Sequence, residues 1–186
     1  MNRLIATNLG IAGLKLIQRK NLGDSRGFFS RIFCNDELRD AGWIEPIAQV
    51  NHTFTAECGT VRGMHFQLAP YAEMKLVSCL RGEVWDVVVD VRHGSDTFLH
   101  WHAELLSAEN QKALLIPKGF AHGFQTLTND VELLYCHSAP FQAEAESGLH
   151  PEDKRLSIQW PLAIAELSFR DSRHSLLSSQ FQGVVL

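Results

Sequence analysis

Several residues that can move a proton or hold an anion lie within a short stretch of the sequence. His65 follows soon after Arg62, and Lys75 comes after a proline-containing loop and leads an apolar segment. An imidazole can take and return a proton near neutral pH, whereas a guanidinium and an ammonium can hold anionic groups. Each of these residues alone is more often structural. Together they favour a site for proton transfer on an anionic substrate.

Histidine is the one residue type in surplus, with nine copies, which raises the alternative of a metal site. Residues 117–122 have the proline, glycine and histidine spacing of the second motif of a cupin-like jelly roll, with His122 as the ligand. The first motif is incomplete, because Gln67 stands where a second histidine would follow His65, and Glu73 is displaced from the usual position. An amide in place of an imidazole removes a strong transition-metal ligand. We therefore expect no functional metal there.

A second His-x-His pair, His100 and His102, shares one side of a predicted strand with Glu104. Leu99 and Trp101 lie on the other side, because successive residues of a strand point to opposite faces. The apolar side is expected to pack on the core. We therefore predict that the histidine side faces water and holds no functional metal.

The overall composition argues against several classes of protein. Lys and Arg total 17 against 21 for Asp and Glu, and a formal net charge of -4 does not suit a broad basic face for nucleic acid. Any bound phosphate must be held by a local cluster of cations. The apolar stretch 9–17 contains two glycines and a lysine, which argues against a signal peptide or a membrane span. The four cysteines lack metal or redox spacing and are predicted to be buried thiols of a cytoplasmic protein.

The elements that position these side chains are predicted to be short β-strands of one domain, since the 186 residues contain no repeat or linker. Segments rich in β-branched and aromatic residues recur at 14–19, 27–33, 47–54, 60–66, 75–80, 83–91, 98–106, 113–116, 123–127 and 131–137. This pattern is typical of an antiparallel sandwich or barrel. Alternation places His65 and Gln67 on one face, and Tyr135 on a face with Leu133 and His137.

Helical signals are weak. Asn35 is predicted to cap a short turn over residues 36–38 that ends at Gly42, and residues 172–179 are a candidate for another. The tail after Pro161 lacks alternation, so we expect it to wrap over the sheets.

A series of motifs runs in a fixed order through most of the chain, from about Leu16 to Asp171. Its members are Asp24-Ser25-Arg26-Gly27-Phe28-Phe29, Gln49-Val50-Asn51, Val61-Arg62-Gly63-Met64-His65-Phe66-Gln67, Lys75-Leu76-Val77, 82–92, 94–98, 116–124, Ile158-Gln159-Trp160-Pro161 and Leu167-Ser168-Phe169-Arg170-Asp171. Each motif alone is weak evidence, whereas so many in one order are specific. In these motifs the chain resembles the nucleotide-sugar 3,5-epimerases that act on dTDP-4-dehydro-6-deoxyglucose in rhamnose biosynthesis.

This resemblance implies a fold, a reaction and partners. The implied fold is all-β: a single cupin-type jelly-roll β-sandwich domain over residues 1–186, with short helices and a C-terminal wrapping tail, in a homodimer. The implied substrate is a nucleotide-diphosphate 4-keto-6-deoxy sugar, whose C4 ketone acidifies the protons on C3 and C5. Epimerisation removes one of these protons as an enolate forms and returns a proton to the opposite face. It needs a base, an oxyanion stabiliser and an acid, with no metal and no redox cofactor.

The resemblance also assigns roles to four residues of this chain. His65 matches the base, and Asp171 matches the partner that fixes the imidazole tautomer and supports its protonated form. Lys75 matches the cation set near the C4 oxygen. Tyr135 matches the proton donor, and it is one of only two tyrosines in the sequence.

Substrate contacts are implied in the same way. Arg26 and Arg62 match arginines that grip the diphosphate, a task for which guanidinium forks are suited. The other matched contacts are Phe29, Gln49, Asn51, His122, Phe141, Glu146 and Arg170. The chain departs from the family pattern at Arg31, where relatives commonly have a glutamate that contacts substrate. It also has Phe141 where relatives often have a tyrosine that stacks on thymine, and a phenyl ring keeps the stacking.

Three alternatives remain open from the sequence. Relatives with the same acid–base set act at only one of the two carbons, or on a related dTDP- or CDP-sugar. A metal-dependent cupin oxygenase would use His65, His122 and Glu73. A non-catalytic protein that binds sugar nucleotides would not require the acid–base set.

Overall fold

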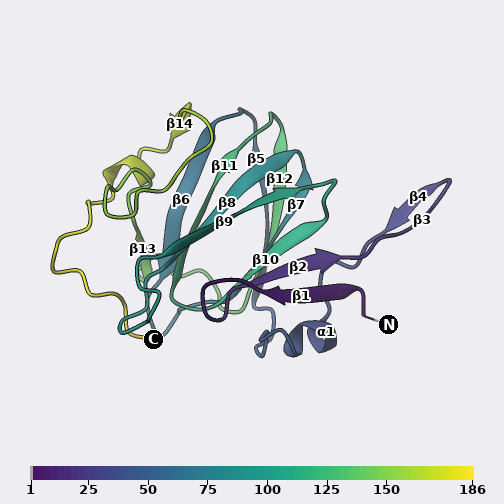
Figure 1. Cartoon of the computed structure of the whole chain (residues 1–186), viewed down its shortest axis with the longest axis horizontal. Coiled ribbons are helices and arrows are strands. Elements are labelled where there is room, and N and C mark those ends of the chain that lie inside the picture. Colours follow the sequence, from purple (N-terminus) through teal and green to yellow (C-terminus); the bar gives the residue numbers. More distant parts are fainter. Residues whose placement is uncertain (1) are drawn as a thin grey trace.

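Two β-sheets face each other in the computed structural model, which describes residues 2–186 (Figure 1). The strands of the first sheet lie in the order β1 (Leu4–Asn8), β2 (Lys15–Arg19), β10 (Lys112–Ile116), β7 (Lys75–Arg81), β12 (Val131–His137) and β5 (Gln49–Thr55). Those of the second lie in the order β13 (Glu146–Gly148), β6 (Thr60–Gln67), β11 (Phe120–Thr126), β8 (Glu83–Asp90) and β9 (Trp101–Ser107), and β14 (Glu166–Leu167) pairs with β6. This arrangement is the predicted jelly-roll β-sandwich.

The main core fills the space between the two sheets. It includes Val77 and Leu133 of the first sheet and Val88 and Phe124 of the second. Alternate residues of each strand face this core, because successive side chains point to opposite sides. Each aliphatic side chain that is fully buried here contributes roughly 1.5–3 kcal/mol relative to an exposed one.

A second apolar cluster covers the outer face of the second sheet. Val87 and Val89 of β8 belong to it, and Trp160 and Phe181 of the C-terminal segment pack against it. That segment includes the short 3-10 helix η1 (Asp171–Arg173) and runs along the outside of the second sheet (Figure 1). The predicted wrapping tail is therefore confirmed.

The α-helix α1 (Asn35–Arg39) packs against the first sheet through Leu38, in a cluster that contains Trp43. The cap position is occupied by Cys34, whose side chain makes no capping hydrogen bond. The prediction that Asn35 caps this helix is therefore wrong by one residue.

A two-stranded arm, β3 (Leu22–Asp24) and β4 (Gly27–Phe29), projects from the sandwich (Figure 1). Phe28 and Phe29 of β4 are 63 % and 60 % exposed. The strand predicted for residues 27–33 therefore stops at Phe29 and pairs outside both sheets.

Every predicted strand segment overlaps a strand of the structure. The pattern misses β1, β3, β13 and β14. The last two span three and two residues, which is too short for an alternation of side chains to be recognised.

The prediction that the histidine side of this strand faces water is confirmed only for His100, which is exposed and precedes β9, and is wrong for His102 and Glu104. Their cross-strand partners in β8 are Val88 and Asp86, and Val88 belongs to the core between the sheets. Glu104 Oε1 lies 2.6 Å from Lys112 Nζ of the first sheet, and the Glu104 side chain is 16 % exposed. The other side of β9 packs toward the C-terminal segment. Because both faces of the second sheet are covered, alternation alone could not identify a water-facing side.

The cysteines are all free thiols, but only Cys79 and Cys136 are buried as predicted, whereas Cys34 and Cys58 are partly exposed. The helical segments of residues 2–186 are α1 and η1. Neither has the length and apolar composition needed to cross a membrane.

Candidate active site

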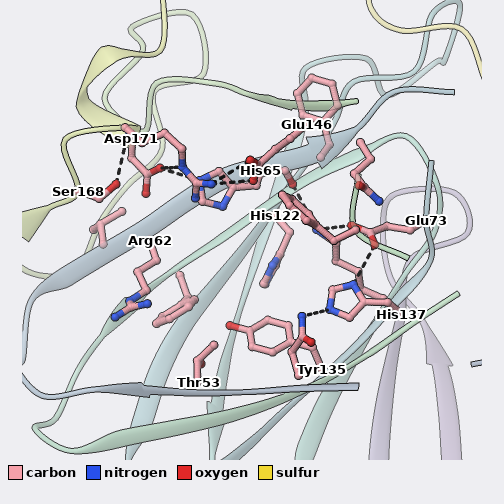
Figure 2. A pocket seen from close by; sticks show the side chains of 18 of the residues that line it. Thr53, Arg62, His65, Glu73, His122, Tyr135, His137, Glu146, Ser168 and Asp171 are labelled. Atoms are coloured by element: carbon pink, nitrogen blue, oxygen red, sulfur yellow. Dashed lines mark hydrogen bonds and ion pairs between the residues drawn. The ribbon is translucent and has the colours of Figure 1, made fainter. Parts of the chain in front are cut away.

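A pocket of about 450 Å³ lies between the two sheets and is lined by side chains of both (Figure 2). Arg62 and His65 reach it from β6 of the second sheet, whereas Lys75 and Tyr135 belong to the first. Asp171 reaches it from η1. The four candidate acid–base residues therefore meet at one cavity, although His65 and Asp171 are 106 positions apart in the sequence.

His65 and Asp171 form a hydrogen-bonded pair in this pocket. His65 Nε2 lies 2.7 Å from Asp171 Oδ1, and the backbone N–H of Gly63 donates to Asp171 Oδ2 at 3.2 Å. Burial acts to raise the pKa of Asp171, but the hydrogen bond and charge of His65 outweigh it, and the pKa lies well below its ordinary value. An ionised carboxylate can only accept, so Nε2 holds the proton of this hydrogen bond, and Nδ1 is the nitrogen that can accept another.

Arg170 lies against this pair. Its Nε is 3.2 Å from Asp171 Oδ1, its Nη2 is 3.0 Å from His65 Nε2, and its Nη1 donates to Glu146 Oε1 at 2.8 Å. Glu146 belongs to β13, which pairs with β6 beside His65. The guanidinium therefore ties the C-terminal segment to the second sheet and keeps Asp171 against the imidazole.

One group of three potential metal ligands occurs among residues 2–186. Ligand atoms of His65, Asp171 and His174 lie within 4.8 Å of one another. The Arg170 guanidinium is within 3.2 Å of two of these side chains, and its positive charge opposes a cation at the same place.

Tyr135 belongs to the first sheet, and its buried ring lies beside two histidines. The centroid of the Tyr135 ring lies 6.0 Å from that of His122, in an edge-to-face arrangement, and 6.0 Å from that of His137, in a stacked arrangement. Burial, and after it the charge of Asp86, raise the pKa of Tyr135 well above its ordinary value. The phenol therefore keeps its proton at neutral pH and is suited to donate it. Tyr135 and His137 both line the pocket, which confirms that they share a face.

His122 is held by a carboxylate of its own. Its Nε2 lies 2.9 Å from Asp86 Oδ2, and both side chains are almost fully buried. His122 is also the cross-strand partner of His65, because β11 pairs with β6 at this point. The two backbones approach so closely that a Cβ on Gly63 would lie 2.5 Å from Gly123 Cα. Glycine is therefore needed where the two histidines are brought together.

Lys75 is accompanied by two residues to which the family resemblance gives no role. Its Nζ lies 3.1 Å from Glu73 Oε1, and Glu73 Oε2 lies 2.9 Å from His137 Nδ1. Both residues line the pocket. In the sequence, Glu73 stands out only as a displaced metal ligand. The strand alternation puts His137 on the same face as Tyr135, and this was the one sequence feature that could have predicted His137 in the pocket.

Most of the predicted substrate contacts line the pocket, namely Asn51, Arg62, His122, Phe141, Glu146 and Arg170. Gln49 lies behind them, donating to Asn51 Oδ1 at 3.1 Å and accepting from the Phe141 N–H at 3.0 Å. Arg26 and Phe29 do not line the pocket of their own chain, because they belong to the projecting arm. There Arg26 pairs with the aspartate two residues before it.

Arg31, the departure from the family pattern, has a structural partner. Its guanidinium bonds Glu37 Oε1, and Glu37 Oε2 accepts the backbone N–H groups of Arg3 and Leu4 at 2.8 Å. Arg31 does not line the pocket. Its charge helps to fasten α1 to the start of β1.

Comparisons with known proteins agree with this geometry. Residues 8–179 match the family model described as dTDP-4-dehydrorhamnose 3,5-epimerase. A curated dTDP-4-dehydrorhamnose 3,5-epimerase from Sinorhizobium fredii is 43% identical over 173 residues, which is 92% of this chain and 89% of the relative.

Two solved structures are similar throughout. The dTDP-4-dehydrorhamnose 3,5-epimerase of Bacillus anthracis, with TDP and PPi bound, has a TM-score of 0.90 and 38% identity, covering 94% of this chain and 99% of that one. The dTDP-6-deoxy-D-glucose-3,5-epimerase of Legionella pneumophila, in complex with dTDP-4-keto-L-rhamnose, has a TM-score of 0.89 and 38% identity, covering 93% and 92%. From the family match and these identities, the chain belongs to the dTDP-4-dehydrorhamnose 3,5-epimerase family and is an isomerase.

Proposed function

We propose that the chain converts dTDP-4-dehydro-6-deoxy-D-glucose into dTDP-4-dehydro-L-rhamnose by inverting C3 and C5. The observation that carries this proposal is the convergence on one pocket of an imidazole–carboxylate pair, an ammonium and a protonated phenol. The imidazole is on the second sheet, whereas the phenol and the ammonium are on the first. Membership of the family supports the nucleotide sugar as the substrate.

His65 is the proposed base. The C4 ketone acidifies the neighbouring C–H bonds, and Nδ1 takes the proton while Nε2 stays hydrogen-bonded to Asp171. The carboxylate then balances the charge of the imidazolium. A positioned base of this kind contributes about 10²- to 10⁴-fold in rate.

Lys75 is the proposed stabiliser of the enolate. As the proton leaves, negative charge develops on the C4 oxygen, and an ammonium already fixed at the pocket needs no rearrangement to meet it. By analogy with oxyanion holes, such a donor is worth about 3–4 kcal/mol in the transition state.

Tyr135 is the proposed acid. It lies on the sheet opposite His65, so it can deliver a proton to the face of the sugar opposite the one that lost it. Its burial keeps the phenol protonated until the enolate forms. Inversion follows from having the base and the acid on different sheets.

Substrate binding is assigned to the rest of the pocket lining. Arg62 offers a guanidinium fork to the diphosphate. Phe141 offers a ring face to the nucleotide base. The remaining proposed contacts are Asn51, His122, Glu146 and Arg170 of the lining, together with Gln49, which bonds Asn51 and Phe141.

Arg26 and Phe29 belong to an exposed arm, and we place them in the pocket of a partner chain in a homodimer. A projecting hairpin with two exposed phenylalanines is typical of a segment that packs against another protein surface. A symmetric dimer would exchange two such arms, one for each pocket. Residues 1–186 would then act as one catalytic domain, and the free thiols suit the reducing cytoplasm.

The product identifies the reaction. After incubation with dTDP-4-dehydro-6-deoxy-D-glucose, NMR couplings of the sugar ring report the configuration at C3 and C5. Inversion at both carbons supports the proposal, and inversion at one carbon identifies a mono-epimerase instead. Tight binding without turnover would identify a sugar-nucleotide binding protein.

Two further experiments distinguish the remaining alternatives. UDP, CDP and GDP analogues of the same sugar test the nucleotide, and we expect the dTDP compound to react fastest. Activity is expected to survive EDTA, because the acid–base set needs no metal. Loss of activity with EDTA and its return with iron would favour the metal-dependent oxygenase.

A further inference from the structure

A series of polar contacts runs along the pocket wall next to Lys75. Lys75 Nζ lies 3.1 Å from Glu73 Oε1, Glu73 Oε2 lies 2.9 Å from His137 Nδ1, and His137 Nε2 lies 3.4 Å from Asn51 Nδ2. The side chains of Lys75, Glu73 and His137 are 10 %, 8 % and 11 % exposed. Figure 2 shows Glu73 above His137 at one side of the pocket, with a dashed contact between them.

The protonation states of the groups in this series of contacts are mutually consistent. Burial acts to raise the pKa of Glu73, but the hydrogen bond from His137 and the charge of Lys75 outweigh it, and the pKa lies below its ordinary value. The ionised carboxylate accepts from His137 Nδ1–H, which leaves Nε2 to accept from the Asn51 amide. Both oxygens of Glu73 therefore have a donor, one from an ammonium and one from an imidazole.

Two contacts account for two of the three N–H bonds of Lys75. One points to Glu73 Oε1, and the other to the backbone carbonyl of His65 at 3.5 Å. Among residues 2–186 no other acceptor lies within hydrogen-bond distance of Nζ. The third N–H is therefore left for a ligand in the pocket.

We propose that Glu73 and His137 are positioning residues for the reaction: together they fix the Lys75 ammonium on the pocket wall and aim its free N–H at the substrate carbonyl oxygen. This inference rests on the proposed function, in which Lys75 stabilises the enolate. The hydrogen bond from Lys75 to the substrate carbonyl oxygen becomes stronger as negative charge develops on that oxygen. Loss of the positioning residues therefore lowers kcat more than it raises KM.

Glu73→Gln is the first test, because it removes the charge and keeps the size of the side chain. We expect kcat to fall about 10- to 100-fold, which is the scale of a misplaced catalytic group. The Kd of dTDP should change less than about twofold, since Glu73 is assigned no contact with the nucleotide. Thermal unfolding and circular dichroism of the variant check that it is folded.

Two variants of His137 test the positioning of Lys75 while Glu73 stays intact. His137→Asn keeps an N–H near the position of Nδ1, whereas His137→Ala removes it. We expect His137→Asn to recover most of the kcat that His137→Ala loses. Equal losses in the two variants would contradict a role for the hydrogen bond to Glu73.

The molecule also supplies a matched control. At the far edge of the sandwich, Glu104 lies 2.6 Å from Lys112 Nζ and 3.6 Å from His102 Nε2, which repeats the grouping of a carboxylate with an ammonium and an imidazole away from the pocket. Glu104→Gln is expected to leave kcat unchanged. An equal fall in kcat for Glu104→Gln and Glu73→Gln would show a general effect of losing such a carboxylate.

Lys75→Met separates this inference from the proposed function. If Lys75→Met leaves kcat unchanged, the proposed role of Lys75 itself fails. If it lowers kcat, Glu73→Gln added to it should cost less than about threefold more, because Glu73 acts through Lys75. A kcat of Glu73→Gln close to that of the unmodified chain, or a full additional loss in the double variant, would overturn the inference alone.

Discussion

At the scale of single residues, the proposed mechanism gives Asp171 the task of keeping the proton on Nε2 of His65, which leaves Nδ1 free to act as the base. The replacement Asp171→Asn keeps the shape but cannot balance the charge of the imidazolium, and its amide N–H₂ can turn toward Nε2. We expect kcat to fall about 10²- to 10⁴-fold with little change in the Kd of dTDP. Steady-state kinetics and calorimetric titration measure the two quantities. A kcat within about threefold of the unmodified chain would mean that Asp171 is only structural.

In the proposed mechanism Tyr135 is the acid, so its removal should affect inversion more than proton removal. Tyr135→Phe removes the donor and leaves His65 and Lys75 in place, so proton removal can continue while protonation from the opposite face fails. We expect exchange of substrate protons with solvent to persist, with little inverted product. NMR of the recovered sugar distinguishes the two. Normal inversion by this variant would show that another group is the acid.

At the scale of the elements, Asp90 at the end of β8 holds the turn that leads to β9. Its carboxylate accepts from Arg92 at 2.7 Å and from Ser95 and Thr97 at 2.6 Å. Burial acts to raise the pKa of Asp90, but these hydrogen bonds outweigh it and lower the pKa from 3.8 to about 2. Because the pKa is lower in the folded state, the stabilisation is complete above pH ~4 and is lost as the pH falls toward 2.

Asp90→Asn should therefore reduce the free energy of unfolding by about 2 kcal/mol at pH 7. The difference from the unmodified chain should shrink as the pH approaches 2. Urea unfolding followed by fluorescence at several pH values measures it. A difference that stays constant with pH would show that charge on Asp90 is not its cause.

The elements also show how far the sequence could predict the molecule. Alternation and β-branched composition locate the long strands, because each buries one or both faces. The pairing of His65 with Asp171 came from the family resemblance, since no local pattern relates residues 106 positions apart. The contact of Glu73 with His137 depends on the register that places His137 opposite Lys75. Register is a property of the assembled sheet, which periodicity within one strand does not specify.

At the scale of the whole molecule, the proposed exchange of arms would make each complete pocket depend on two chains. An Arg26→Ala chain and a His65→Ala chain should each be inactive as homodimers. After subunit exchange, a mixed dimer combines one intact His65 pocket with one intact arm, so about a quarter of all pockets are restored in an equal mixture. Activity of the mixture, compared with that of each variant alone, measures this. No recovery despite proven exchange would place Arg26 in its own chain's pocket or outside catalysis.

The proposed reaction uses both sheets of the molecule: His65 removes the protons next to the C4 ketone, and Tyr135 returns a proton from the other sheet. Incubation with dTDP-4-dehydro-6-deoxy-D-glucose in D₂O, followed by NMR of the C3 and C5 positions, tests it most directly. We expect deuterium at both carbons with inverted configuration, and no incorporation by His65→Asn. Incorporation at neither carbon by the unmodified chain, or undiminished incorporation by His65→Asn, would contradict it.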